Sequence, residues 1–164
     1  MRLSIILGCL LLIVGCSTHK DTQSFHHVTS LDEDEGVIYL FFPGEGITRG
    51  PDLFSFGQSL YINGEKLGML EIETYVPLVL PAGNHTIRTT SNWNHQAFPD
   101  LNVSVGIKPG EAKYLQYIWT GKSLDQQSNL WISRYLEVKE TEAIGKLGCC
   151  ALNSKLTKAA SKLR

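Results

Sequence analysis

The sequence predicts a mainly β protein, an antiparallel sandwich of about seven or eight strands with a helix at its C-terminal end. Between residues 36 and 140, short runs rich in β-branched and aromatic residues alternate with clusters of Gly, Pro, Asn and Asp, as in strands joined by turns. After Glu140 the apolar residues recur at helical spacing instead. Helical segments do not separate the predicted strands, which argues against a parallel α/β sheet.

Residues 36–42, G-V-I-Y-L-F-F, form the most continuous apolar run of this domain. Such a run of β-branched and aromatic residues predicts a central strand of the sandwich. Pro43 ends the strand, because proline has no N–H to donate to a neighbouring strand.

The stretch from residue 59 to residue 90 predicts a meander of short strands. Asn63-Gly64 is the strongest two-residue hairpin signal, because such a turn needs positive φ at both of its central positions. A second turn signal, P-A-G, ends at Gly83. We therefore expect Gly64 and Gly83 to have positive φ.

Three further strands are predicted over residues 101–107, 113–120 and 130–139, where apolar residues alternate or aromatic residues gather. Two long connections, 44–57 and 91–100, separate strands of the domain. The sandwich domain is expected to span residues 36–140.

Residues 141–164 predict a C-terminal helix followed by a basic tail. Residues 142–150 include Ile144 and Leu147 and carry little charge, so this part is expected to dock on the sandwich. From Asn153 onward, leucine and alanine share one side of a helix and lysines lie on another. We expect this tail to be exposed and to fold against an anionic membrane or an acidic partner.

Residues 1–16 have the pattern of a lipoprotein export signal. Met1-Arg2 supplies positive charge, the apolar run 3–14 is too short to span a bilayer, and I-V-G-C ends at Cys16. We expect residues 1–15 to be removed and the Cys16 thiol to carry acyl chains such as palmitate, which anchor the protein to a membrane. The alternative is an ordinary signal peptide with a chance cysteine.

The residues after Cys16 bear on localisation and on the linker. An aspartate in the place of Ser17 would favour the inner membrane of a Gram-negative envelope, so we predict the outer membrane, facing the periplasm. Residues 16–35 are polar and predict a flexible tether, in which the acidic run 32–35 is solvated rather than a calcium loop. His26 and His27 lack partner ligands at suitable spacing, so no metal is expected.

Charge and motifs argue against nucleic-acid binding and against several catalytic classes. The formal net charge of −1 provides no basic field for nucleic acid. Gly121-Lys122-Ser123 lacks the glycine that a phosphate-binding loop places five residues earlier, and the G-x-S-x-G motif of serine hydrolases is absent. We therefore predict a non-enzymatic binding or scaffolding module without catalytic residues or cofactors. Its expected partners are the membrane and an envelope protein.

The two long connections hold the candidate binding surface. Its members are aromatic or basic side chains: Arg49, Phe54, Phe56, Trp93 and His95. Long loops at the end of a sandwich commonly hold sites, although the two phenylalanines could equally cap the core. The alternative function is a periplasmic hydrolase or sugar-modifying enzyme with its site between these connections.

His85 and the two C-terminal cysteines each have a structural and a functional interpretation. His85 follows a turn, and we expect it to bond neighbouring backbone rather than a metal. Cys149 and Cys150 are expected to pack as small apolar residues under the C-terminal helix, with an intermolecular disulfide as the alternative.

Several short motifs follow one another in a set order: a strand ending in N-G, then K-L-G-x-L, an aromatic at Tyr75, L-P-A-G-N-H and K-P-G-E-A-K-Y-L. This order resembles the DUF2846 family of bacterial lipoproteins. The similarity covers roughly residues 36–143 and implies an envelope lipoprotein with a β-sandwich, but no activity. A basic residue that the family pattern places near the end of the first strand is replaced here by Phe42-Pro43, with Arg49 as the nearest substitute.

Overall fold

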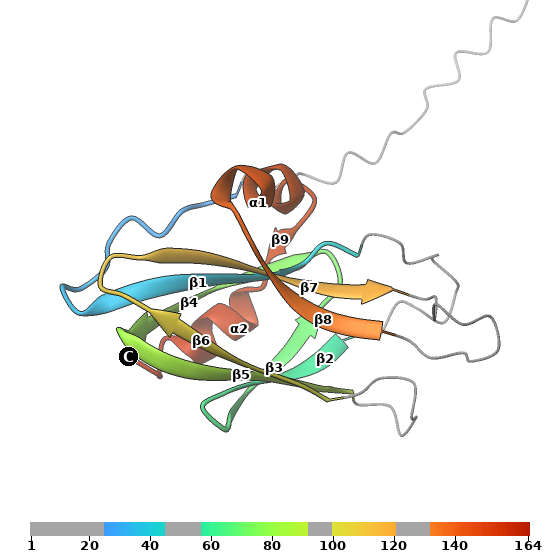
Figure 1. Ribbon diagram of the computed structural model, residues 1–164, viewed down its shortest axis with the longest axis horizontal. Helices are drawn as coiled ribbons and strands as arrows, with labels where there is room; N and C mark the ends of the chain where they lie inside the picture. Colours follow the sequence, from blue (N-terminus) through green and yellow to red (C-terminus); the bar gives the residue numbers. More distant parts are fainter. Residues whose placement is uncertain (1–24, 45–56, 92–99, 121–131) are drawn as a thin grey trace, which may run out of the picture.

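A computed structural model describes residues 25–44, 57–91, 100–120 and 132–164 (Figure 1). Two β-sheets face each other, and two short helices follow the last long strand. The five-stranded sheet has the order β8-β7-β1-β4-β9, with β1 (Glu35–Phe42), β4 (Thr74–Pro81), β7 (Ala112–Thr120), β8 (Ile132–Val138) and β9 (Ala151–Leu152). The four-stranded sheet has the order β3-β2-β5-β6, with β2 (Gly57–Ile62), β3 (Glu65–Glu71), β5 (Gly83–Ser91) and β6 (Leu101–Ile107).

The predicted mainly β sandwich with a C-terminal helix is confirmed. Every residue of β1 is buried, and β1 is the middle strand of its sheet, as its continuous apolar sequence indicates. Two strand pairs nevertheless run parallel, β1 with β7 and β4 with β9, so the five-stranded sheet is mixed rather than wholly antiparallel. The β1–β7 pair can be parallel because the intervening strands give the chain room to cross over before it returns.

The two turns predicted from glycine are confirmed. Asn63 and Gly64 have φ of 51° and 86° and join β2 to β3 in a hairpin, in which Ile62 is opposite Glu65. Gly83 has φ of 147°, a conformation that side chains with a Cβ rarely adopt. These turns set the register that directs the apolar side chains of the meander inward.

The inner core lies between the two sheets and is mainly aliphatic. Its buried members include Ile38, Leu40, Leu60, Ile62, Leu78, Leu80, Ile87 and Leu115. Helix α2 (Ser154–Ala160) closes this core beside β3 and β4, with Leu156 and Ala160 only 1% and 2% exposed. The expectation that the chain is exposed from Asn153 onward is therefore wrong, because the gap beside β3 and β4 gives its apolar stripe a place to bury.

Asn153 fixes the start of α2. Its Oδ1 accepts a hydrogen bond from the backbone N–H of Leu156 at 3.1 Å, which is the bond of a helix N-cap. Its Nδ2 donates to the carbonyl of Met69 in β3 at 3.1 Å. One buried side chain thus begins the helix and ties it to the edge of the four-stranded sheet.

The outer face of the five-stranded sheet is covered by α1 (Glu140–Leu147), on the opposite side of that sheet from α2 (Figure 1). Leu147 is buried there together with Ala143, as expected for docking, but Ile144, which was also expected to dock, is 43% exposed. The helical stretch expected from residue 141 through Cys150 ends earlier, because the chain turns after Leu147 and forms β9. Backbone bonds from Ala151 to Glu73 and from Asn153 to Tyr75, both 2.8 Å, place β9 beside β4.

Residues 25–31, called the strap, also cover this outer face. Phe25, Val28 and Leu31 are partly buried against it, although they were expected to belong to a flexible tether reaching residue 35. Glu35 was expected in a solvated acidic run, but it is 5% exposed and begins β1. The structure therefore corrects the end of the tether, because the apolar side chains of the strap have a surface on which to pack.

Candidate functional site: the tyrosine face

None of the residues predicted to form a binding surface falls in the part of the chain that the structure describes. Arg49, Phe54, Phe56, Trp93, His95 and the lipidation residue Cys16 all lie outside it. The described strands place the end of the 44–57 connection beside the start of the 91–100 connection, because Gln58 at the start of β2 is opposite Ser91 at the end of β5. The connections 44–57 and 91–100 are thus joined to neighbouring strand ends.

The most distinctive described cluster consists of Tyr39, Tyr75 and Tyr114, called here the tyrosine face, whose side chains are all buried under the strap and α1. Tyr39 of β1 is opposite Tyr114 of β7 in the parallel pairing, and Tyr75 comes from β4 on the other side of β1. The rings of Tyr39 and Tyr114 stack with centroids 5.1 Å apart. Because side chains alternate along a strand, all three rings point away from the inner core toward the strap and α1.

The strap is seated on this face by aromatic contacts and by backbone hydrogen bonds. The ring of Phe25 stands edge-on to Tyr39 and Tyr75, at centroid distances of 5.0 and 5.4 Å. The hydroxyl of Tyr39 accepts from the N–H of Val28 at 2.6 Å, and the hydroxyl of Tyr75 accepts from the N–H of His26 at 3.3 Å. The tyrosines therefore bind a peptide backbone, and the peptide is the protein's own N-terminal segment.

An open hollow of about 430 Å³ lies beside Tyr114, between β7, β8 and the start of α1. Its lining is Ala112, Lys113, Tyr114, Glu137, Val138, Lys139 and Glu140. The Tyr114 hydroxyl donates to Glu140 Oε1 at 3.1 Å, and Lys113 pairs with Glu137 at 3.3 Å. The hollow thus carries charges of both signs and has no single-sign field that would select an anion or a cation.

The pKa values of the tyrosine hydroxyls argue against their use as a general base or a nucleophile. Burial raises the pKa of Tyr39, and burial together with the hydrogen bond to Glu140 raises the pKa of Tyr114. Both hydroxyls stay protonated at neutral pH, so they can exchange hydrogen bonds but cannot act as bases or nucleophiles.

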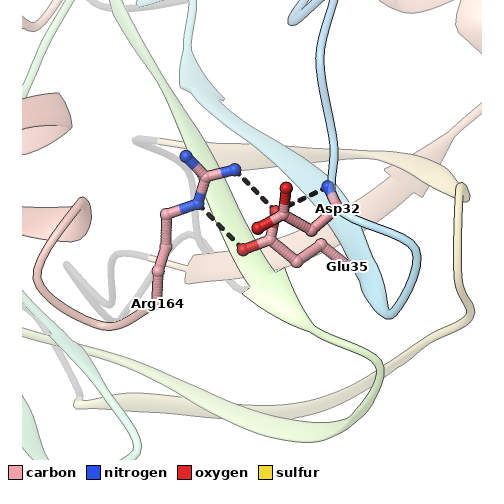
Figure 2. Close-up of polar contacts among 3 residues, drawn as sticks. All are labelled: Asp32, Glu35 and Arg164. Carbon is pink, nitrogen blue, oxygen red and sulfur yellow. Dashed lines mark hydrogen bonds and ion pairs between the residues drawn. The ribbon is translucent and has the colours of Figure 1, made fainter.

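A clasp of Glu35 and Arg164 joins the start of β1 to the chain beyond α2 (Figure 2). The Arg164 guanidinium donates from Nε to Glu35 Oε1 at 2.9 Å and from a terminal nitrogen to Oε2 at 2.6 Å. The backbone N–H of Asp32 donates to the same carboxylate at 3.0 Å. The hydrogen bonds from Arg164 and Asp32 hold the pKa of Glu35 below its usual value, so the pair remains charged at neutral pH.

The predictions for histidine and cysteine have different outcomes. His85 is buried and bonds the carbonyl of Pro81 at 2.7 Å and the amide of Asn63 at 3.0 Å, as the backbone interpretation predicted. Cys150 is buried against the cluster under α1, as expected, but Cys149 is exposed. The expected packing of both thiols is thus correct only for Cys150.

Sequence reasoning missed the strap. The signal was present as apolar residues three apart, Phe25, Val28 and Leu31, within an otherwise polar segment. Across the described residues, no group of three His, Cys, Asp or Glu side chains is placed to hold a metal ion. The two helices of the described ranges are also too short to cross a membrane.

Comparison with known proteins gives no match, either to a family model or to a curated sequence.

Proposed function

We propose that this protein is a lipid-anchored envelope protein whose β-sandwich serves as a non-catalytic binding or scaffolding module. The observation that carries the proposal is the I-V-G-C sequence ending at Cys16, directly after the apolar run 3–14. With Ser17 next, the proposed location is the outer membrane, with the domain facing the periplasm. The resemblance to DUF2846 lipoproteins is in line with this proposal.

The strap gives the anchor a short reach. Phe25 lies nine positions after Cys16, and a fully extended chain spans at most about 3.3–3.6 Å per residue. The packed strap would therefore keep the tyrosine face within roughly 30 Å of the acylated residue. A flexible tether reaching residue 35 would allow about twice that distance. This supports a domain that works close to the membrane surface.

The described titratable groups support a non-catalytic role. Glu35 is engaged by Arg164, Glu140 accepts from Tyr114, and His85 bonds Pro81 and Asn63. Each of these groups holds one part of the fold to another, and the pair that lines the open hollow, Glu140 with Tyr114, joins α1 to β7. Binding through the strap side or through the long connections needs no catalytic pair of titratable groups.

Fractionation of a Cys16→Ser variant tests the anchor. Because the acyl chains need the thiol, the variant should lose incorporation of a labelled fatty acid and should leave the membrane fraction or remain as an uncleaved precursor. Cys149→Ser is the matched control and should keep both the label and the membrane location. A Cys16→Ser protein that is processed and fractionates like wild type would remove the proposal.

The alternative is a hydrolase or sugar-modifying enzyme with a site between 44–57 and 91–100. The pairing of Gln58 with Ser91 favours it, because it joins both connections to neighbouring strand ends. His95 and Arg49 are the groups that such a site would use. Hydrolysis of envelope glycans by the purified protein, lost in His95→Ala but kept in His85→Ala, would establish the enzyme and overturn the binding role.

A further inference from the structure

The adjacent thiols of Cys149 and Cys150 lie where α1 meets β9. Their Sγ atoms are 3.4 Å apart, Cys149 is exposed, and Cys150 is 2% exposed. A disulfide bond is about 2.05 Å long, so the two sulfurs are in contact without being bonded. One reactive position is thus open to solvent, and its neighbour is held against it from the protein side.

We propose that Cys149 and Cys150 form a reversible two-electron redox site whose substrate class is a disulfide, either low-molecular-weight or on another protein. Cys149 is the attacking thiol, because it is the accessible member of the pair. Cys150 is the resolving thiol, because its sulfur already touches that of Cys149 while its burial keeps other disulfides away. This site is independent of the lipid anchor and of the binding role proposed above.

The reaction takes two exchange steps. The Cys149 thiolate attacks one sulfur of the substrate R–S–S–R, which forms a Cys149–S–S–R mixed disulfide and releases one RS⁻. The Cys150 thiolate then attacks the sulfur of Cys149, which forms the Cys149–Cys150 disulfide and releases the second RS⁻. The two cysteines lose two protons and two electrons, and the substrate becomes two thiols.

The product is expected to be readily reduced. Neighbouring Cα atoms are about 3.8 Å apart, whereas most disulfides join Cα atoms about 4.4–6.8 Å apart. A bond between adjacent cysteines is therefore strained, and strained disulfides are the reducible, regulatory kind rather than structural crosslinks. The site is thus suited to cycling between dithiol and disulfide.

Its surroundings give the oxidation a structural consequence. The N–H of Cys150 bonds the carbonyl of Leu147 at 2.9 Å, and the N–H of Ala151 bonds Glu73 at 2.8 Å. Cys149 Sγ also contacts the carbonyl of Lys146 at 2.9 Å. Closure of the ring would therefore change the backbone between the end of α1 and the start of β9, next to the cover of the tyrosine face.

Peptide mapping of the full-length protein tests the proposal. The protein is incubated natively with oxidised glutathione, quenched with acid, alkylated and digested with trypsin. Cleavage after Lys146 and Lys155 yields peptide 147–155, which contains both cysteines and neither Cys9 nor Cys16. The expected wild-type peptide has lost two hydrogens and carries no glutathione, and dithiothreitol returns it to the doubly alkylated form.

Single variants assign the two roles. Cys150→Ser should retain glutathione on Cys149, because no second thiol resolves the mixed disulfide. Cys149→Ser should react with oxidised glutathione at least roughly tenfold more slowly than wild type, because the remaining thiol is buried. A wild-type peptide that keeps glutathione, joins a second copy of the chain, or stays doubly alkylated after oxidation would overturn the proposal, and this readout on the unaltered protein does not depend on the variants folding.

Discussion

The two sides of the five-stranded sheet are covered in different ways. The inner core lies against the second sheet and is completed by α2, with mainly aliphatic side chains. The outer cluster contains the three tyrosines, and among the described residues its cover consists of α1, the strap and the chain around Cys150. Backbone N–H groups of the strap bond tyrosine hydroxyls in the outer cluster, so part of its cover is held by polar contacts.

The inner core and the outer cluster therefore contribute to different properties of the protein. Burial of aliphatic surface in the inner core supplies the larger share of stability, because it removes the most apolar area from water. The outer cluster connects the fold to the segment that leads toward Cys16, through ring contacts of Phe25 and two backbone hydrogen bonds to tyrosine hydroxyls. The comparison predicts large stability losses on the inner side and smaller, local effects on the outer side.

The largest effect is expected for Leu156→Ala in α2. Leu156 is 1% exposed in the inner core, so its truncation should cost about 2–4 kcal/mol in the free energy of unfolding. Urea unfolding monitored by circular dichroism measures this change. Lys155→Ala, at an exposed neighbouring position, is the control; an equally small change in both variants would mean that α2 does not close the core.

Phe25→Ala should have an intermediate effect on the outer side. The loss of two edge-on aromatic contacts and of partly buried area should cost about 1–2 kcal/mol, with faster hydrogen exchange at the amides of His26 and Val28. Thr29→Ala, an exposed change in the same strap, should leave that exchange unaltered. Equal exchange in wild type and Phe25→Ala would show that the strap is not held by the tyrosine face.

The Glu35–Arg164 clasp should make a pH-dependent contribution to stability. The folded-state pKa of Glu35 lies below its ordinary value of 4.5, so the contribution is present above that value and is lost as pH falls through the folded-state pKa. Glu35→Gln should lower stability at neutral pH and flatten the loss between neutral and acidic pH. Glu33→Gln, an exposed change, is the control; an unchanged acid profile in Glu35→Gln would contradict the clasp.

Two glycine substitutions should give the smallest effects, of opposite sign. Gly64 has φ of 86° and no atom within 4 Å of an added Cβ, so Gly64→Ala should cost about 1 kcal/mol from backbone strain alone. Gly145 lies within α1 with similar free space, and Gly145→Ala should gain up to about 1 kcal/mol from helix propensity. Thermal unfolding of both variants measures whether each substitution raises or lowers stability. A stabilising Gly64→Ala would argue against the left-handed turn.

Local features of the fold could be predicted from sequence because their causes are local. The alternation over residues 101–107 matches β6, and Asn63-Gly64 forms the expected turn. The parallel pairing of β1 with β7 could not be predicted, because it joins segments far apart in sequence and leaves no local pattern. The same reason hid the contacts of Phe25 and Leu156, since each residue packs on a surface that exists only after the sheets have formed.

The candidate site was predictable in part. Tyr39 and Tyr114 fell within predicted strands. The alternation of side chains along each strand does not show, however, that the two rings stack between the parallel strands β1 and β7. The clasp between Glu35 and Arg164 could not be predicted, because Glu35 is the last residue of an acidic run that is typical of a solvated linker. Its partner Arg164 is 129 residues away in the sequence, beyond the reach of any local motif.

The mass of the protein extracted from membranes tests the central claim most directly. The account predicts a chain that begins at Cys16 and is heavier than residues 16–164 by a thioether-linked diacylglycerol or by that group and an N-terminal acyl chain. Fragmentation should place the whole addition on Cys16. A chain that begins elsewhere, or one that contains Cys16 without any acyl addition, would contradict the proposal of a lipid-anchored domain.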